Sequence, residues 1–200
     1  SYAMTEPGVS GSAPTMIRAS AQRVSGGWRV SGRKWFTSGA ATASYVTVLA
    51  RTEPEHLSLL MVPTDQLGFR VVRELPVLGA AGQFEIEFTG AHVPDDHMLG
   101  SPGDGLAIAG TRLALGRTLR SLRWVGQAQR AFELMCRRAN DRSIHSGPLA
   151  GQQLVQQLVF DSLLAIRSAR ALVGEAAALV ADLRPAKAEI GLAKVAAARA

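Results

Sequence analysis

Hydrophobic and polar residues alternate along much of the first hundred residues. Short runs rich in β-branched and aromatic residues are separated by turn-forming residues, a pattern typical of strands. The run Phe84–Phe88 alternates strictly, with Glu85 and Glu87 between apolar residues, which predicts one buried and one wet face. Six short strands with no helix between them predict an antiparallel β-barrel or sandwich. The strands are expected at residues 15–24, 28–37, 45–51, 57–63, 69–75 and 84–88, with Ser25-Gly26-Gly27 joining the first two as a hairpin.

The period becomes helical after the glycine-rich segment 98–105. Apolar residues then recur three or four positions apart from Leu106 to about Ala139, and again from Gln152 to Asp182. Pro185 fits the first position of a third helix that runs to the end of the chain. The predicted fold is therefore a multidomain mixture of α and β. It consists of a β domain at 1–101 followed by an incomplete up-and-down helical bundle at 102–200.

The last residues, 194–200, contain no glycine, proline or polar tail that would end a helix. Three helices also make an incomplete bundle, which leaves apolar surface in need of cover. We therefore expect the chain to be a fragment that stops within its helical domain.

Composition excludes several classes of protein. Of 200 residues, 47% are hydrophobic and 19% charged, so a buried core is available and fibrous or disordered folds are excluded. The longest mostly apolar run, 171–183, is too short for a bilayer and holds two acidic residues. Because no signal segment is recognised, a cytoplasmic setting is expected. The single cysteine, Cys136, excludes an internal disulfide, and no Cys or His spacing fits a metal site.

The net charge of +6 is unevenly distributed along the chain. Residues 1–109 hold 8 Lys and Arg against 10 Asp and Glu, whereas residues 110–200 hold 14 against 6. A basic second half indicates phosphate, an acidic protein surface or nucleic acid as partner, with a solvated helix face as the alternative. Arg123, Arg130 and Arg137 recur every seven residues. We interpret this stripe first as a subunit interface or solvated face and second as an anion site.

Two stretches of the β domain carry candidate chemistry. Thr5-Glu6-Pro7-Gly8 is a turn, because Pro fixes φ at its second position and Gly tolerates a positive φ at its third. Gly11 and Ser12 follow with backbone N–H groups and a hydroxyl that suit a phosphate or a flat ring. Further along, simple alternation would place Trp35 and Thr37 on one face, presenting an indole plane and a hydroxyl together. Taken singly, these features are also explained as a turn and as barrel packing.

The order of these motifs resembles the middle β domain of the acyl-CoA dehydrogenase family. Tyr2-Ala3-Met4-Thr5-Glu6-Pro7-Gly8 precedes Gly11-Ser12, a hairpin and then Gly32-Arg33-Lys34-Trp35-Phe36-Thr37-Ser38-Gly39. The likeness covers essentially all 200 residues. Its later motifs are Val93-Pro94, Leu99-Gly100, Gly116-Arg117, residues 125–131, Asp141-Arg142, Pro148-Leu149 and Gln153.

The resemblance implies a flavin site that holds FAD in the β domain. Met4 and Thr5 would hydrogen-bond the pyrimidine edge of the isoalloxazine through main chain and hydroxyl, where donors stabilise the negative charge of the reduced ring. Trp35 would flank the ring on the face away from substrate, and Thr37 would reach the N5 edge. Gly11, together with Ser12, matches positions near the flavin pyrophosphate.

The helical half adds further implied contacts. Arg142 matches an arginine that reaches the FAD of a neighbouring subunit, and Gln153 matches another FAD contact. Ser12 and Arg117 match positions near the acyl-CoA. The sequence departs from the family at Ile144 and His145, beside Arg142. It also departs at Ala13, which replaces an acid after a loop one residue longer than the commonest pattern.

The implied activity is α,β-dehydrogenation of an acyl-CoA thioester, as in fatty acid β-oxidation, with hydride passing to flavin N5. The family places its catalytic glutamate either early in the long helix, where this chain has Gly116, or much later. The base is therefore expected beyond Ala200, and the chain alone is expected to be inactive. The implied partners are an acyl-CoA substrate, an electron-transfer flavoprotein and further copies of the chain in a homodimer or homotetramer. Neither a membrane nor a metal is implied.

Two alternatives belong to other classes of function. A DNA-binding flavoprotein of the alkylation-response branch would use the basic helical half, although nucleic acid is not the expected partner. A non-catalytic assembly subunit would lack FAD. Oxidases and nitroalkane-oxidising relatives share the same motifs, so the electron acceptor stays open at this point.

Overall fold

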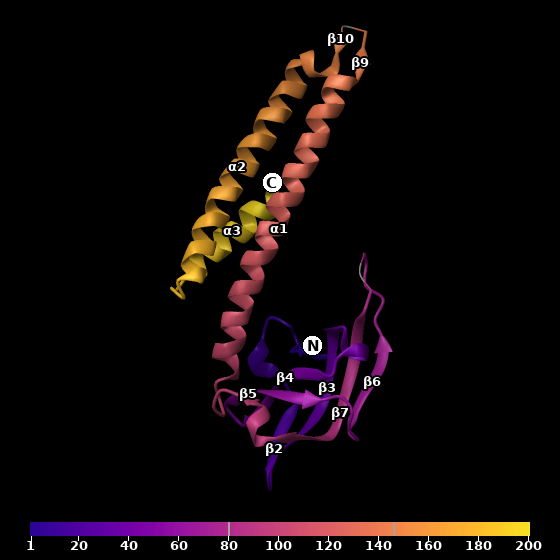
Figure 1. Ribbon diagram of the computed structural model, residues 1–200, viewed down its shortest axis with the longest axis vertical. Helices are drawn as coiled ribbons and strands as arrows, with labels where there is room; N and C mark the ends of the chain where they lie inside the picture. Colours follow the sequence, from indigo (N-terminus) through magenta and orange to yellow (C-terminus); the bar gives the residue numbers. More distant parts are fainter. Residues whose placement is uncertain (80, 146) are drawn as a thin grey trace. The chain divides into compact units, whose positions relative to one another are not determined.

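Eight strands form one sheet in the first half of the chain (Figure 1). The computed structural model describes residues 1–79, 81–145 and 147–200. The strands are β1 Tyr2–Ala3, β2 Ser20–Val24, β3 Gly27–Ser38, β4 Tyr45–Glu53, β5 His56–Pro63, β6 Phe69–Glu74, β7 Gln83–Pro94 and β8 Met98–Leu99. Short 3-10 turns lie between them at η1 Pro14–Met16, η2 Ala40–Thr42 and η3 Asp95–His97.

The strands are ordered β6-β7-β3-β2-β4-β5-β8, and β1 pairs with β4 in parallel. The neighbours are otherwise antiparallel, except that β2 meets β4 in parallel through the pair Ser20 and Arg51. The path is open, with β6 and β8 at its ends. The predicted antiparallel β fold is confirmed. Of the two predicted architectures, a closed barrel is not formed by the described residues, whereas a sandwich is compatible with the observed sheet.

The middle of this sheet is buried on both faces. In β4, Val48 and Ala50 belong to the larger apolar cluster, whereas Leu49 between them belongs to a second cluster with Leu57 and Leu59. Alternation along a strand sends neighbours to opposite faces, so both faces of β4 contact apolar side chains. Ile17 and Ala19, in the segment that leads into β2, pack into the second cluster.

The first hairpin forms as the sequence predicts, but its first strand is shorter. Val24 pairs with Gly27, so Ser25 and Gly26 make the turn. The expected strand at 15–24 begins only at Ser20, because residues 14–16 form η1. The Arg51 guanidinium donates to the carbonyls of Thr15, at 2.6 Å, and Ile17, at 3.3 Å, which withdraws these groups from any strand ladder.

Three helices follow the sheet, as predicted: α1 Gly105–Asp141, α2 Gln153–Ala181 and α3 Lys187–Arg199. Helices α1 and α2 run antiparallel and side by side (Figure 1). They are joined by β9 Ser143–Ile144, β10 Gly147–Pro148 and η4 Leu149–Gly151. The third helix starts after Pro185 rather than at it. Ala186 keeps a non-helical φ of −141° while its carbonyl accepts the first helical bond, from Ile190.

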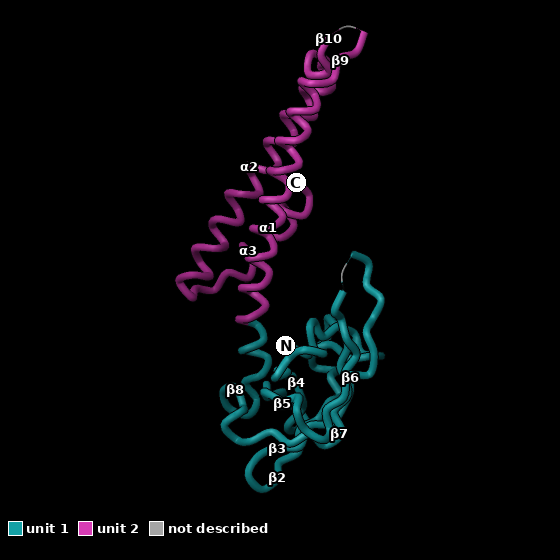
Figure 2. The backbone as a smooth tube through the Cα atoms, turned by 45° about the vertical axis from the view of Figure 1, so that its right-hand side comes forward, with its two compact units in different colours: residues 1–110 teal, residues 111–200 magenta. Residues whose placement is uncertain are grey.

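The chain divides into two compact units, residues 1–110 and residues 111–200 (Figure 2). The core of the second unit is rich in alanine, which lets helix backbones approach closely. It is formed by Val125, Ala169, Val173, Ala176, Ala186, Ile190, Ala193 and Ala197. Large apolar side chains stay exposed on the same helices, which confirms the expected uncovered surface. They include Leu119, Leu122, Leu154, Leu158 and Phe160.

Candidate functional site

The segment around Thr5 is hydrogen-bonded to β3 at Trp35. The Thr5 hydroxyl donates to the Trp35 carbonyl at 2.9 Å, and the Trp35 amide donates to the Thr5 carbonyl at 3.0 Å. The two residues are 30 positions apart in the sequence. The two stretches that carry the candidate chemistry therefore meet in space, as the resemblance implies.

The loop after Thr5 contains the predicted turn. The Glu6 carbonyl accepts from the Val9 amide at 3.4 Å, and Gly8 adopts a positive φ of 74° between them. At Gly11, a Cβ would lie 3.2 Å from the Thr5 methyl group, so this part of the loop packs directly on Thr5. Met4, Thr5 and Gly11 consequently line one small pocket. Its other lining residues are Glu6, Val9, Ser10, Pro14 and Ile17.

Ser12 lies next to this pocket on the exposed part of the loop. Its hydroxyl is 2.8 Å from the hydroxyl of Ser10, and the two form a hydrogen bond. The structure thus brings Met4, Thr5, Gly11 and Ser12 together on one loop, with Trp35 held against it.

A β-bulge in β3 changes the side-chain alternation near Trp35. The pairing of β3 with β7 runs from Lys34–Ile86 to Thr37–Phe84, so Trp35 and Phe36 together face a single residue of β7. Phe36 adopts a left-handed φ of 50°, which is unusual for a residue with a Cβ. The assumption of simple alternation from Trp35 to Thr37 is therefore wrong, because the extra residue shifts the parity of the strand.

The bulge buries Thr37 and leaves the two aromatic rings outside. Lys34 and Thr37 are fully buried, Trp35 is half-buried, and Phe36 is exposed. The Trp35 and Phe36 ring centroids lie 4.9 Å apart. Within the described residues, the buried Thr37 hydroxyl finds no hydrogen-bond partner. An unsatisfied buried hydroxyl is energetically costly, which makes Thr37 a candidate for a hydrogen bond that the chain itself does not supply.

A buried ion pair between Lys34 and Glu6 anchors the loop that carries Thr5. The Lys34 ammonium donates to the Glu6 carboxylate at 2.8 Å and to the Met4 carbonyl at 3.0 Å. The same carboxylate accepts from the amides of Arg18, at 2.8 Å, and Ala19, at 2.9 Å. Both charged side chains are buried. Burial lowers the pKa of Lys34 to about 8, although the neighbouring Glu6 favours its charged form.

Sequence reasoning missed this pair, because charged residues are usually assigned to the surface. One signal was available. Lys34 lies at the same parity in β3 as Trp28 and Val30, which are buried. A lysine in step with core residues predicts an inward-facing ammonium that needs a carboxylate partner.

In the second unit, Arg142 and Gln153 lie at one end of the α1–α2 pair. Arg142 directly follows α1, and its carbonyl accepts from the Leu149 amide at 2.7 Å, closing the connection to α2. Gln153 is the first residue of α2. Both side chains are exposed. The two residues are thus brought to the same end of the helical pair.

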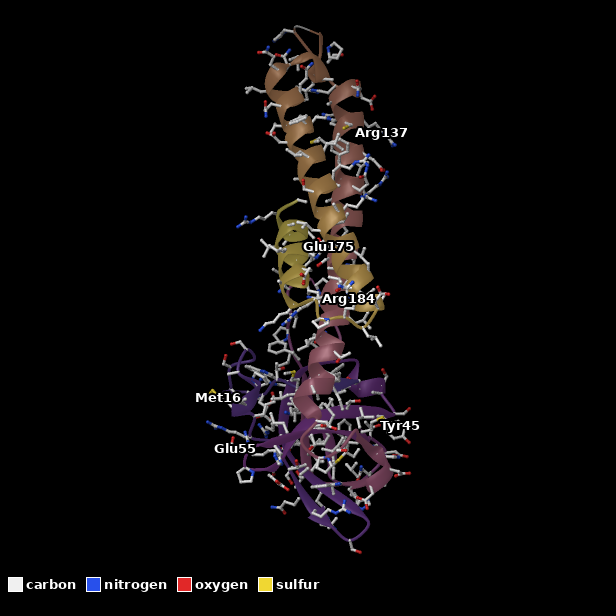
Figure 3. The ribbon with its side chains drawn as sticks, turned by 90° about the vertical axis from the view of Figure 1, so that its left-hand side faces the viewer. Met16, Tyr45, Glu55, Arg137, Glu175 and Arg184 are labelled. Atoms are coloured by element: carbon white, nitrogen blue, oxygen red, sulfur yellow. The ribbon has the colours of Figure 1, made fainter. Side chains whose placement is uncertain are left out.

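Arg117 lies on α1, where its side chain is exposed. It lines a cavity of about 440 Å³ whose other residues come from α1 and α3, among them Arg112, Arg120 and Lys194. The arginine stripe of α1 is exposed as well, and Arg137 projects outward from the helix (Figure 3). The positive charge of the second unit is therefore accessible to solvent.

Across residues 1–79, 81–145 and 147–200, no three His, Cys, Asp or Glu side chains gather as a metal site requires. No helix in the described part of the chain combines the length and hydropathy needed to cross a bilayer.

Two family models match the chain. One, described as "Acyl-CoA dehydrogenase, middle domain", matches residues 1–91, and the other, "Acyl-CoA dehydrogenase, C-terminal domain", matches residues 103–200. Among curated proteins, the probable acyl-CoA dehydrogenase FadE2 of Mycobacterium tuberculosis is 38% identical over 186 residues. That match covers 88% of this chain and 46% of FadE2.

Solved structures give the same result. The glutaryl-coenzyme A dehydrogenase glutaryl-CoA complex superposes with a TM-score of 0.87 at 26% identity, over 99% of this chain and 52% of that one. PigA with FAD and proline superposes with a TM-score of 0.92 at 25% identity, over 99% and 53%. The chain thus spans about half the length of these relatives.

Proposed function

The chain belongs to the acyl-CoA dehydrogenase family, and from this premise we propose that it forms part of an FAD-dependent enzyme that introduces an α,β double bond into an acyl-CoA thioester. Both family models support the proposal, as does the likeness to a dehydrogenase solved with glutaryl-CoA and to a protein solved with FAD. The single observation that carries it is the double hydrogen bond between Thr5 and Trp35, which joins the two motif-bearing stretches.

The residues around that contact fit a flat ring with hydrogen-bonding edges. The Thr5 hydroxyl already donates its hydrogen to the Trp35 carbonyl. Toward a ligand it can therefore only accept, which suits the ring N–H of a flavin pyrimidine. Met4 contributes main-chain groups beside it. The half-buried Trp35 indole would flank the ring, and the unpartnered hydroxyl of Thr37, which is fully buried here, would bond its N5 edge once a local rearrangement uncovers it.

The remaining assignments extend from this shelf. Gly11 and Ser12 would lie along the pyrophosphate, where small residues allow close approach of backbone N–H groups. Arg142 and Gln153 would bind the FAD of a neighbouring subunit, and Arg117, together with Ser12, would contact the acyl-CoA. When bound, FAD accepts the hydride. No residue of this chain is proposed as the base, because Gly116 has no side chain to take the α-proton.

We further propose that electrons leave to an electron-transfer flavoprotein and that the chain assembles as a homodimer or homotetramer. Exposed leucines on α1 and α2 support self-association, because monomeric proteins rarely leave such faces uncovered. The cytoplasmic setting and a place in fatty acid β-oxidation stay predictions.

A spectrum of the full-length protein tests the function. We expect visible flavin absorbance that bleaches when an acyl-CoA substrate is added without oxygen. Replacing Thr37 by Val removes the unpartnered hydroxyl, so we expect unchanged or slightly higher melting temperature but about 100-fold slower bleaching. Thr42→Val, on the exposed η2 turn, is the matched control and leaves the rate unchanged.

Three outcomes contradict the proposal. A colourless protein that takes up no FAD excludes the flavin site. If the protein binds flavin but no acyl-CoA of any chain length bleaches it, acyl-CoA thioesters are excluded as the substrate class. Equal bleaching rates for Thr37→Val and the wild type exclude the role given to Thr37.

A further inference from the structure

The Glu6 carboxylate connects three segments that are separate in the sequence. It belongs to the loop that carries Thr5, it receives the Lys34 ammonium from β3, and it receives two backbone amides from residues 18–19 at the entry to β2. Each contact is 2.8–2.9 Å long. Together with the bond from Lys34 to the Met4 carbonyl, four hydrogen bonds therefore surround the buried Glu6–Lys34 pair.

The segment before β2 is held from its other side as well. The Arg51 guanidinium donates to the carbonyls of Thr15 and Ile17, whereas the Glu6 carboxylate accepts from the amides of the next two residues, 18 and 19. Lys34 in turn is the residue directly before Trp35, whose amide and carbonyl both bond to Thr5. The position of Thr5 is thus determined by contacts on both its sides along the chain.

Global stability alone does not account for this pair. Removing two charges from water costs several kcal/mol, which their attraction only roughly offsets, and neutral replacements of similar size are often as stable. What an ion pair supplies and an apolar pair does not is direction. It fixes which atoms face one another and therefore the register of the loop against β3.

We propose that Glu6 and Lys34 are positioning residues for the flavin, holding the Met4–Thr5 peptide so that its N–H meets the pyrimidine edge of the ring. This inference rests on the proposed function. The ammonium acts through the Met4 carbonyl. Its positive charge lies 3.0 Å from the carbonyl oxygen and polarises the peptide group that joins Met4 to Thr5. The Thr5 N–H becomes a stronger donor, which favours the electron-rich reduced ring over the oxidised one.

The decisive experiment uses a neutral double variant of the full-length protein, Glu6→Gln with Lys34→Met. FAD is titrated into the apoprotein and its binding followed by fluorescence. The midpoint potential of the bound flavin and the melting temperature are measured on the same samples. We expect a lower melting temperature, because Glu6→Gln can accept only one of the two backbone amide bonds, together with FAD bound about tenfold more weakly and a more negative midpoint potential.

A matched control replaces an ion pair away from the loop, Arg23 with Asp95, by Met and Asn. This pair is exposed, and its replacement is expected to leave affinity and potential unchanged. If the first double variant does not fold, Glu6→Gln with Lys34→Gln serves, because it leaves no unpaired charge buried and keeps an amide donor at position 34.

The outcomes separate the two proposals. A wild-type protein that binds no FAD overturns the proposed function. A wild type that binds FAD, beside a folded double variant with the same affinity and the same potential, overturns the positioning role and leaves the function standing. Weaker binding with a more negative potential supports both.

Discussion

Lys34 places a full charge where it has no access to water. Its pKa falls to about 8 because of burial, against an ordinary value of 10.5 in the unfolded chain. Below pH 8 both states hold the proton, and the folded protein bears the whole cost of the buried charge. Between the two values the unfolded chain keeps a proton that the folded protein has released, so the free energy of unfolding rises with pH.

This residue yields a prediction for stability against pH. From pH 8 to 10.5, the wild type is expected to gain about 3 kcal/mol relative to the Glu6→Gln, Lys34→Met variant, since the variant lacks the titrating group. Urea unfolding of both proteins at several pH values measures the difference. A difference that stays flat or falls over this range contradicts the lowered pKa.

Single residues also show where sequence reasoning works and where it stops. The meeting of Thr5 with Trp35 was predictable, because recognisable motifs surround both residues. The roles of Glu6 and Lys34 were not, because a charged side chain looks the same in a sequence whether it is solvated or paired. Thr37 was expected beside Trp35, and only the local extra residue Phe36 separates their faces.

At the level of elements, the start of α1 is fixed by a close contact with β5. A Cβ on Gly105 would lie 2.5 Å from the Leu57 carbonyl oxygen and 2.8 Å from Leu49. Only glycine allows the first turn of the helix to pack this closely on the strand. Gly110, one and a half turns further along, has no neighbour within 4 Å of its Cβ position.

Two substitutions in α1 are therefore expected to act in opposite directions. Gly105→Ala should destabilise the protein by about 2 kcal/mol, because backbone must move to admit the methyl group. Gly110→Ala should stabilise it by up to about 1 kcal/mol through helix propensity. Thermal unfolding of the two variants beside the wild type tests this. Equal changes in stability for the two variants would mean that the close contact of Gly105 with Leu57 does not limit the side chain at position 105.

Long elements were predictable, and very short ones were not. All three helices and six strands follow from periodicity, with shifted ends. The two-residue strands β1 and β8 were missed because two residues carry no period, and their pairing depends on β4 and β5. The strand β7 runs on to Pro94, past the strict alternation that ends at Phe88, because it continues to pair with β3 as far as Gly27.

Over the whole molecule, apolar surface is distributed unevenly. Leu154 and Leu158 are 81% and 61% exposed, one turn apart on α2. The core of that unit consists mainly of alanines, so the larger side chains contribute little to it. Such a surface is expected to be covered in the assembled protein.

This distribution predicts self-association. Replacing Leu154 and Leu158 by Gln should lower the assembly state seen in sedimentation by weakening association at least about tenfold, while the melting temperature at high dilution stays unchanged. Leu78→Gln, at a fully exposed loop residue of the first unit, is the control. Unchanged sedimentation of the α2 variant would remove these leucines from the interface.

The extra residue at Phe36 constrains how this chain can diverge. Because Trp35 and Phe36 together occupy one step of the strand, losing one of them would straighten β3 but leave Thr37 inward and Ser38 outward. Related genes are therefore expected to tolerate the loss of one position at the bulge, whereas a single loss elsewhere in the paired part of β3 would turn buried side chains outward. Where the bulge is lost, one of the two aromatic rings should be missing, while the residue that corresponds to Thr37 stays buried.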